Sequence, residues 1–166
     1  ISIDTTTLIT GFTIQNGNAQ FSSPFYSGGG MFLWWPSPTL KDITFSDNTT
    51  NMNGGGMFIY NSSPTLTGVT FSNNTANMKG GGMYLIGSSS PTLTNSILWG
   101  NSPEEIYYSN VGEENSITIT YSDIQGGEAE IVTNDNGTVY WGDGNIDDDP
   151  LFCDTGNGDF TLASNS

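Results

Sequence analysis

The sequence predicts an all-β fold in which short parallel strands wind into a β-solenoid, a parallel β-helix of about six coils with roughly 26 residues each. Three features support this prediction. A segment of three glycines and a methionine occurs three times, and apolar residues recur at fixed positions after it. Clusters of Gly, Asn, Ser and Pro separate the apolar segments, as expected for corners between short strands.

The repeats align on Gly28, Gly54 and Gly80, which are 26 residues apart. After the glycines, each copy has a Met, then a Ser-Pro pair, then a Leu, and later a Phe or Leu in the same order. The third copy slips by one residue because it contains an extra Ser. Weaker copies lie at residues 11–17 and 117–127, so the repeat extends through most of the chain.

Each copy contains three expected strand segments, which in the middle copy are MFI (57–59), PTL (64–66) and VTF (69–71). A leucine-rich repeat is the competing interpretation, because LTGVTFSNN (66–74) fits the consensus phrase of that architecture. Leucine-rich repeats place a helix or a 3₁₀ segment in the second half of each unit. Here the second half holds three glycines and a Ser-Pro pair, which disfavour helix.

A single coil of this kind cannot be stable alone. Burying about five apolar side chains yields roughly 1.5–3 kcal/mol each, whereas ordering a residue costs about 1–2 kcal/mol. Stacked coils share backbone hydrogen bonds and bury like side chains on like. We therefore expect the residues that close the repeats, Asn48, Asn74 and Asn101, to form a structural ladder of buried corner amides.

The strand after each glycine triplet carries large apolar residues at consecutive positions. If Met and Leu or Ile point inward, the residues between them point outward in two columns. The candidate interaction face consists of Phe32, Trp34, Trp35, Phe58, Tyr60 and Tyr84. A patch of several hundred Å² is more than soluble monomers usually expose. We expect residues 101–166, a neighbouring subunit or a sugar chain to cover it, unless the rings only stiffen the sheet.

Charge divides the chain into two parts of one domain, regular coils at residues 1–101 and acidic, less regular coils or a cap at residues 102–166. The formal net charge is −15, with 17 acidic residues, two basic residues and no His. Most acids follow residue 100, and neither base does. Nucleic acid is excluded as a partner, because phosphate contacts require a basic surface.

The same composition argues against catalysis. A Ser-His-Asp triad is excluded because the chain has no His. A polysaccharide lyase needs a base beside carboxylate-bound calcium, and Lys41 and Lys79 are far in sequence from the main acid cluster. We assign no catalytic residue and expect no enzyme; a polysaccharide lyase or hydrolase is the enzyme class that stays open.

Calcium is the one cofactor that the sequence suggests. Oxygen-bearing side chains alternate along DGNIDDDPLFCD, with spacing close to that of a calcium-binding loop. The candidate ligands are Asp143, Asn145, Asp147, Asp149 and Asp154. Asp148 stands where that loop has Gly, and Pro150 interrupts it, so a structural turn explains the acids equally well. Cys153 is the only cysteine, which excludes an intrachain disulfide.

The GGGM repeats followed by SSPTLTGVTFSNNTA resemble right-handed parallel β-helix repeat proteins of bacterial and archaeal surfaces. The closing segments YSDIQGG, GNIDDDPLF and GDFTLASNS resemble those members that carry a choice-of-anchor module. The resemblance implies a single-stranded right-handed β-helix and a secreted or surface-attached protein. It implies no reaction.

These observations predict a non-catalytic extracellular module with a structural or adhesive role. We expect it either to assemble with itself, end to end or laterally, into a filament, or to bind a surface polymer. The alternative is a carbohydrate-binding or polysaccharide-cleaving module that uses the aromatic face. The sequence has no apolar run of about 18 residues, so we expect no membrane insertion. A signal peptide is also not recognised, and we interpret the chain as a mature or excised piece.

Overall fold

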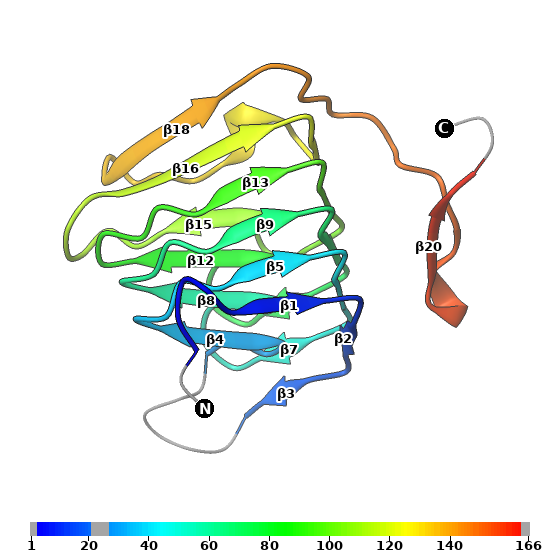
Figure 1. Ribbon diagram of the computed structural model, residues 1–166, viewed down its shortest axis with the longest axis horizontal. Helices are drawn as coiled ribbons and strands as arrows, with labels where there is room; N and C mark the ends of the chain where they lie inside the picture. Colours follow the sequence, from blue (N-terminus) through cyan, green and yellow to red (C-terminus); the bar gives the residue numbers. More distant parts are fainter. Residues whose placement is uncertain (1–2, 21–26, 164–166) are drawn as a thin grey trace.

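The computed structural model describes residues 3–20 and 27–163. Its strands form four parallel sheets that wrap around one apolar core, and each strand pairs with its counterpart in the next coil (Figure 1). The predicted all-β parallel solenoid is therefore confirmed. We name the sheets A to D in the order in which the chain visits them.

Sheet A contains β1 (Leu8–Thr10), β5 (Thr39–Lys41), β9 (Thr65–Thr67), β13 (Thr92–Thr94), β16 (Asn115–Thr120) and β18 (Gly137–Trp141). Sheet B contains β2 (Thr13–Gln15), β6 (Thr44–Ser46), β10 (Thr70–Ser72), β14 (Ile97–Trp99) and β17 (Asp123–Ile124). Sheet C contains β3 (Asn18–Ala19), β7 (Thr49–Thr50) and β11 (Thr75–Ala76). Sheet D contains β4 (Met31–Trp34), β8 (Met57–Tyr60), β12 (Met83–Ile86) and β15 (Ile106–Tyr108).

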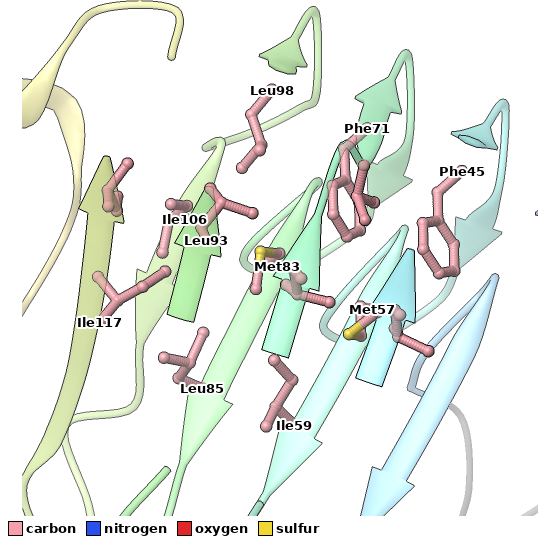
Figure 2. Close-up of a cluster of buried hydrophobic side chains, with 14 of the residues drawn as sticks. Phe45, Met57, Ile59, Phe71, Met83, Leu85, Leu93, Leu98, Ile106 and Ile117 are labelled. Carbon is pink, nitrogen blue, oxygen red and sulfur yellow. The ribbon is translucent and has the colours of Figure 1, made fainter. Parts of the chain in front are cut away.

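The pairing register places the repeated phrases residue over residue. Met57 of β8 pairs with Met83 of β12, and Phe45 of β6 pairs with Phe71 of β10. The inward side chains of successive coils therefore form columns, seen for Phe45, Phe71 and Leu98 in Figure 2. The rings of Phe45 and Phe71 stack with their centroids 4.7 Å apart and their planes 7° apart. These columns are the core that holds the coils together.

The three glycines of each repeat serve different purposes, as the middle copy shows. Gly54 has a φ of 70°, in the left-handed region that favours glycine. A Cβ on Gly55 would lie 2.5 Å from the carbonyl oxygen of Gly81 in the next coil. A Cβ on Gly56 would lie 2.7 Å from the ring of Phe71. The triplet thus allows one sharp corner and close packing of both backbone and aromatic ring.

The turns differ from the prediction in number and composition. A regular turn has four strand segments instead of three, because the two-residue strands β7 and β11 form sheet C. There are about four turns instead of six. The chain returns to sheet A as β18, and Ile146 still bridges to Asp123 of sheet B before the chain leaves the coils (Figure 1). The residues that follow add no further turn.

The C-terminal residues form a linker and an antiparallel hairpin beside the coils (Figure 1). The hairpin consists of β19 (Phe152–Asp154), the short 3₁₀ helix η2 (Thr155–Asn157) and β20 (Asp159–Leu162). A second 3₁₀ helix, η1 (Glu128–Glu130), lies between β17 and β18. None of the helices in the described parts of the chain has the length and apolar character needed to span a membrane.

Candidate functional site

The six residues of the predicted aromatic face divide into two groups with different geometry. Phe32, Phe58 and Tyr84 form one outward column on sheet D, and Tyr107 extends it. Successive ring centroids are 4.9, 5.3 and 5.7 Å apart, with planes within 10° of parallel. Because each ring covers the face of its neighbour, this column presents mainly edges to the outside and stiffens the sheet.

Sequence reasoning missed Tyr107. Its strand aligns Ile106 with Met83, an offset shorter than the 26 residues of the regular repeat, and no glycine triplet precedes it. The signal that could have found it is the apolar triplet IYY, which follows the pattern of MYL in the preceding coil.

The second group forms an exposed cluster at the corner after β4, which we call the aromatic corner: Trp34, Trp35 and Tyr60. The side chains of Trp34 and Trp35 are 47% and 65% exposed. The centroid of the Tyr60 ring lies 4.8 Å from that of the Trp34 ring, and these two rings are tilted against each other. The Tyr60 and Trp35 ring centroids are 6.1 Å apart, and these two rings meet edge-on. Unlike the stacked column, these rings are not parallel, and both indoles are accessible to a ligand.

Trp35 has an unusual backbone for a bulky residue. Its φ is 76°, and its amide donates a hydrogen bond of 3.0 Å to the carbonyl oxygen of Tyr60. Asn61 and Gly87 occupy the equivalent corner in the following coils, with φ of 47° and 70°. Asn and Gly tolerate this conformation, whereas Trp adopts it at a cost of about 1–3 kcal/mol. At this corner an exposed Trp therefore adopts a backbone conformation that Trp residues disfavour.

An open hollow of about 520 Å³ adjoins the aromatic corner. It is lined by residues 34–37, among them Trp34, Trp35 and Ser37, and by residues 3–5, among them Asp4 and Thr5. The hydroxyl and amide of Thr6 donate hydrogen bonds of 2.7 and 2.9 Å to Asp4 Oδ1. These bonds lower the pKa of Asp4, so its carboxylate is ionised at neutral pH. The hollow therefore combines accessible indole faces with a carboxylate and hydroxyl groups.

The three asparagines of the predicted ladder lie inside the coils, away from this hollow. Asn48 Nδ2 donates to Asn74 Oδ1 at 2.9 Å, and Asn74 Nδ2 donates to Asn101 Oδ1 at 2.8 Å. Asn101 in turn donates from its backbone amide and its Nδ2 to the carboxylate of Glu105. Burial raises the pKa of Glu105 to about 7, although the bonds from Asn101 oppose this shift.

Two further polar columns were not anticipated. In one, the backbone amide of Ser96 donates to the Ser122 hydroxyl, and the amide of Ser122 donates to Asn145 Oδ1. In the other, the amide of Ser62 donates to the Ser89 hydroxyl, and the amide of Ser89 donates to Asn115 Oδ1. The recurring serines were a sequence signal for these columns. Without the pairing register, however, a recurring serine is equally consistent with an exposed corner.

The candidate calcium ligands do not converge on one point. Asn145 belongs to a polar column, and Asp147 Oδ1 accepts a hydrogen bond from the amide of Gly126. Asp149 Oδ1 accepts from the amide of Leu151, and Asp154 Oδ2 accepts from Asn157 within the hairpin. Asp143 is exposed, and its backbone oxygen accepts from Tyr121. Within the described ranges, no group of three or more His, Cys, Asp or Glu side chains could hold a metal ion. Calcium stays a prediction.

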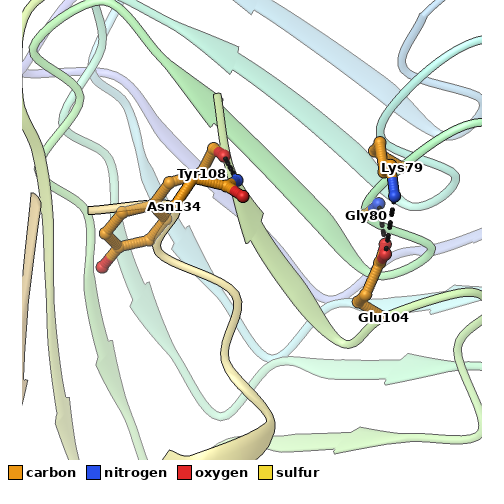
Figure 3. A network of polar contacts seen from close by, with 5 residues as sticks. All are labelled: Lys79, Gly80, Glu104, Tyr108 and Asn134. Atoms are coloured by element: carbon orange, nitrogen blue, oxygen red, sulfur yellow. Dashed lines mark hydrogen bonds and ion pairs between the residues drawn. The ribbon is translucent and has the colours of Figure 1, made fainter. Parts of the chain in front are cut away.

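Both lysines lie beside acidic side chains. Lys79 Nζ is 3.5 Å from Glu104 Oε1, and Glu104 Oε2 accepts a hydrogen bond from the amide of Gly80 (Figure 3). Lys79 also lies 5.1 Å from the centroid of the Tyr107 ring. Lys41 Nζ is 3.9 Å from Asp42 Oδ2 on an exposed surface.

A family model described as a right-handed beta helix region matches residues 1–149. A search of curated proteins and a search of solved structures each give no match. The matched region includes all four parallel sheets and ends before the C-terminal hairpin. Because the match covers most of the chain and agrees with the observed sheets, the protein belongs to the family with a right-handed beta helix region.

Proposed function

We propose that the protein is a non-catalytic extracellular adhesive module whose aromatic corner binds a neutral glycan of a surface polymer. The observation that carries this proposal is Trp35, an exposed indole in a left-handed backbone conformation that bulky residues avoid. Strain of this kind persists where the position of the side chain matters more than the stability of the fold.

The chemistry of the hollow fits a sugar. Indole faces offer flat apolar surfaces for stacking, and Asp4, Thr5 and Ser37 supply hydroxyl and carboxylate groups for sugar hydroxyls. The carboxylate of Asp4 and the net charge of −15 repel uronic acids, so a neutral glycan is favoured over an acidic one. The stacked coils would act as a rigid support for this corner.

Binding to soluble neutral and acidic polysaccharides tests the proposal, with Trp fluorescence and calorimetry as readouts. Trp35→Asn is the informative variant, because Asn61 occupies the same corner one coil later and adopts the same backbone. Tyr140→Ala is the matched control, since Tyr140 is an aromatic residue of similar exposure (57%) on sheet A. We expect a neutral glycan to bind, Trp35→Asn to lose at least about tenfold in affinity, and Tyr140→Ala to bind normally. Equal binding by Trp35→Asn would sink the proposal.

The family includes enzymes that act on polysaccharides, and the proposal places this chain among its non-catalytic members. Supporting this, both lysines lie beside carboxylates elsewhere on the coils, and neither lines the hollow at the aromatic corner, where a lyase would need a base. Release of reducing ends or of unsaturated products from the bound glycan would contradict it.

End-to-end assembly is a second candidate, because the first coil is less well covered than the next. Ile9 and Ile14 are only partly buried, whereas Leu40 and Phe45, their partners in the following coil, are fully buried. A coil of a second copy stacked on this end would cover them. Light scattering over a range of concentrations tests this candidate, and a constant monomer mass would exclude it.

A further inference from the structure

A second hollow, of about 420 Å³, lies on the opposite part of the molecule, between the last coils and the C-terminal segment. Its floor is formed by residues at the start of β14 and β17, including Ile97, Tyr121 and Asp123. Its other wall comes from the linker and the hairpin, including Asp148, Asp149 and Leu162. The hollow is of the size that binds small molecules, and most of its surface is apolar.

Asp123 is the unusual residue of this hollow. It continues an outward column of sheet B whose preceding members are Thr44, Thr70 and Ile97. An acid therefore replaces Thr or Ile in a position that is only 7% exposed. Its Oδ1 accepts a hydrogen bond of 3.3 Å from the amide of Asp148. Within the described residues no hydrogen bond reaches Oδ2, although the carboxyl group borders the hollow.

The surroundings of Asp123 are negative and contain no compensating base. Burial raises the pKa of Asp123 to about 6; the Asp148 amide opposes the shift, and the charges of Asp147, Asp148 and Asp149 add to it. Lys41 and Lys79, the only basic residues of the chain, lie beside Asp42 and Glu104 instead. A buried carboxylate of this kind is normally paired with a cation.

We propose that this hollow binds an organic ammonium group carried on an apolar stem. The ammonium would lie between Asp123 and the carboxylates of Asp148 and Asp149, with the ring of Tyr121 as a cation–π partner. Ile97 and Leu162 would contact the stem. A third hollow, of about 340 Å³, lies between the same hairpin and the preceding coils.

Calorimetry with n-hexylammonium tests the charge requirement, with 1-hexanol and hexanoate as neutral and anionic analogues of the same length. The titrations are made at about 0.15 M salt, so that attraction to the acidic surface in general is screened. We expect the ammonium compound to bind, the alcohol to bind at least about tenfold more weakly, and hexanoate not to bind. Stronger binding of the alcohol would overturn the proposal.

Asp123→Asn and Ile97→Thr locate the binding. Asn keeps an oxygen for the Asp148 amide but removes the charge, and Thr is the residue that stands at this column position in two preceding coils. Both variants should weaken binding of n-hexylammonium, Asp123→Asn by at least about tenfold. Glu114→Gln, which removes an exposed charge elsewhere, should bind like the unaltered protein. Circular dichroism checks that each variant is folded, and equal binding by folded Asp123→Asn would refute the site.

Two further experiments vary the pH and the molecule that carries the ammonium group. Binding should weaken between pH 7.5 and pH 5, because Asp123 takes up a proton near pH 6 and loses the charge that the ligand requires. Nα-acetyl-lysine amide represents a protein side chain, whose ammonium is carried on a four-carbon apolar stem. Competition with n-hexylammonium would identify a lysine side chain as the source, and failure to compete would restrict the site to free alkylamines. This site shares no residue with the aromatic corner, so the two proposals fail independently.

Discussion

The regular coils and the acid-rich C-terminal part use the same columns for different purposes. Between residues 39 and 101, each inward column repeats one kind of side chain, as the stacked Phe45 and Phe71 show. After residue 101 the columns continue, but Glu105 follows the asparagines and Asp123 follows Thr70 and Ile97. The columns of repeated side chains stabilise the coils, and the positions where an acid interrupts a column carry buried carboxyl groups.

The largest loss of stability is expected from a substitution in the regular columns. Phe71→Ala should lower the free energy of unfolding by about 3–5 kcal/mol, because Phe71 is fully buried between Phe45 and Leu98. Urea unfolding measures the change. Phe12→Ala, at an exposed position in the first coil, should cost far less. Similar losses for the two variants would show that stacking in the column is not what holds the coils.

The broken columns should make stability depend on pH. The pKa of Glu105 is about 7 in the folded chain and near 4.5 when unfolded, so the unfolded state releases its proton at lower pH. Stability is therefore lost as pH rises from about 4.5 to 7, by about 3 kcal/mol for this group. Thermal unfolding of the unaltered protein and of Glu105→Gln between pH 4.5 and 8 should show the variant gaining relative stability with pH. Parallel curves would contradict this assignment.

The asparagine ladder connects the two regions. Asn74→Ala should cost about 2–3 kcal/mol, because it leaves the buried amide groups of Asn48 and Asn101 without their partner. Asn77→Ala serves as the control, since Asn77 is exposed and its side chain bonds only to Asn51 among the described residues. Denaturant unfolding of both variants separates a ladder contribution from a general effect of losing an amide.

The smallest effect is expected at the aromatic corner, and it has the opposite sign. Trp35→Asn should raise the free energy of unfolding by about 1 kcal/mol, because Asn tolerates a left-handed backbone that strains Trp. The same variant should lose glycan binding. A clear loss of stability in urea unfolding would mean that the indole supports the fold and that its exposure has another cause.

The columns could be predicted from the sequence because they depend only on a repeated spacing. The pairing of Met57 with Met83 could be predicted without the structure, because each methionine follows an identical glycine triplet. Features outside the regular spacing were missed. Tyr107 lies in a shorter coil, and the two residues of β7 are too few to show a pattern. The aromatic residues of the candidate face could be named from the sequence, but which rings stack and which stay accessible depends on side-chain geometry.

The C-terminal part was the hardest to anticipate. Its acids alternate like the ligands of a calcium loop, yet Asp147 and Asp149 accept hydrogen bonds from backbone amides at separate points. Asp123 did not stand out, because a single acid in YSDIQGG has no meaning until the register places it after Ile97. Alternation in sequence does not determine proximity where the chain leaves the coils.

The amide ladder also gives the solenoid a direction. Each carboxamide from Asn48 to Asn101 donates one hydrogen bond to a backbone carbonyl of the preceding coil and one to the next side chain of the ladder, and Glu105 accepts the last of these side-chain bonds. Because the middle unit both receives and offers the same contact, a duplicated copy of residues 54–79 could be spliced in after residue 79 without reversing the polarity. The molecule could thereby be lengthened one rung at a time, while the terminating carboxylate stays in place.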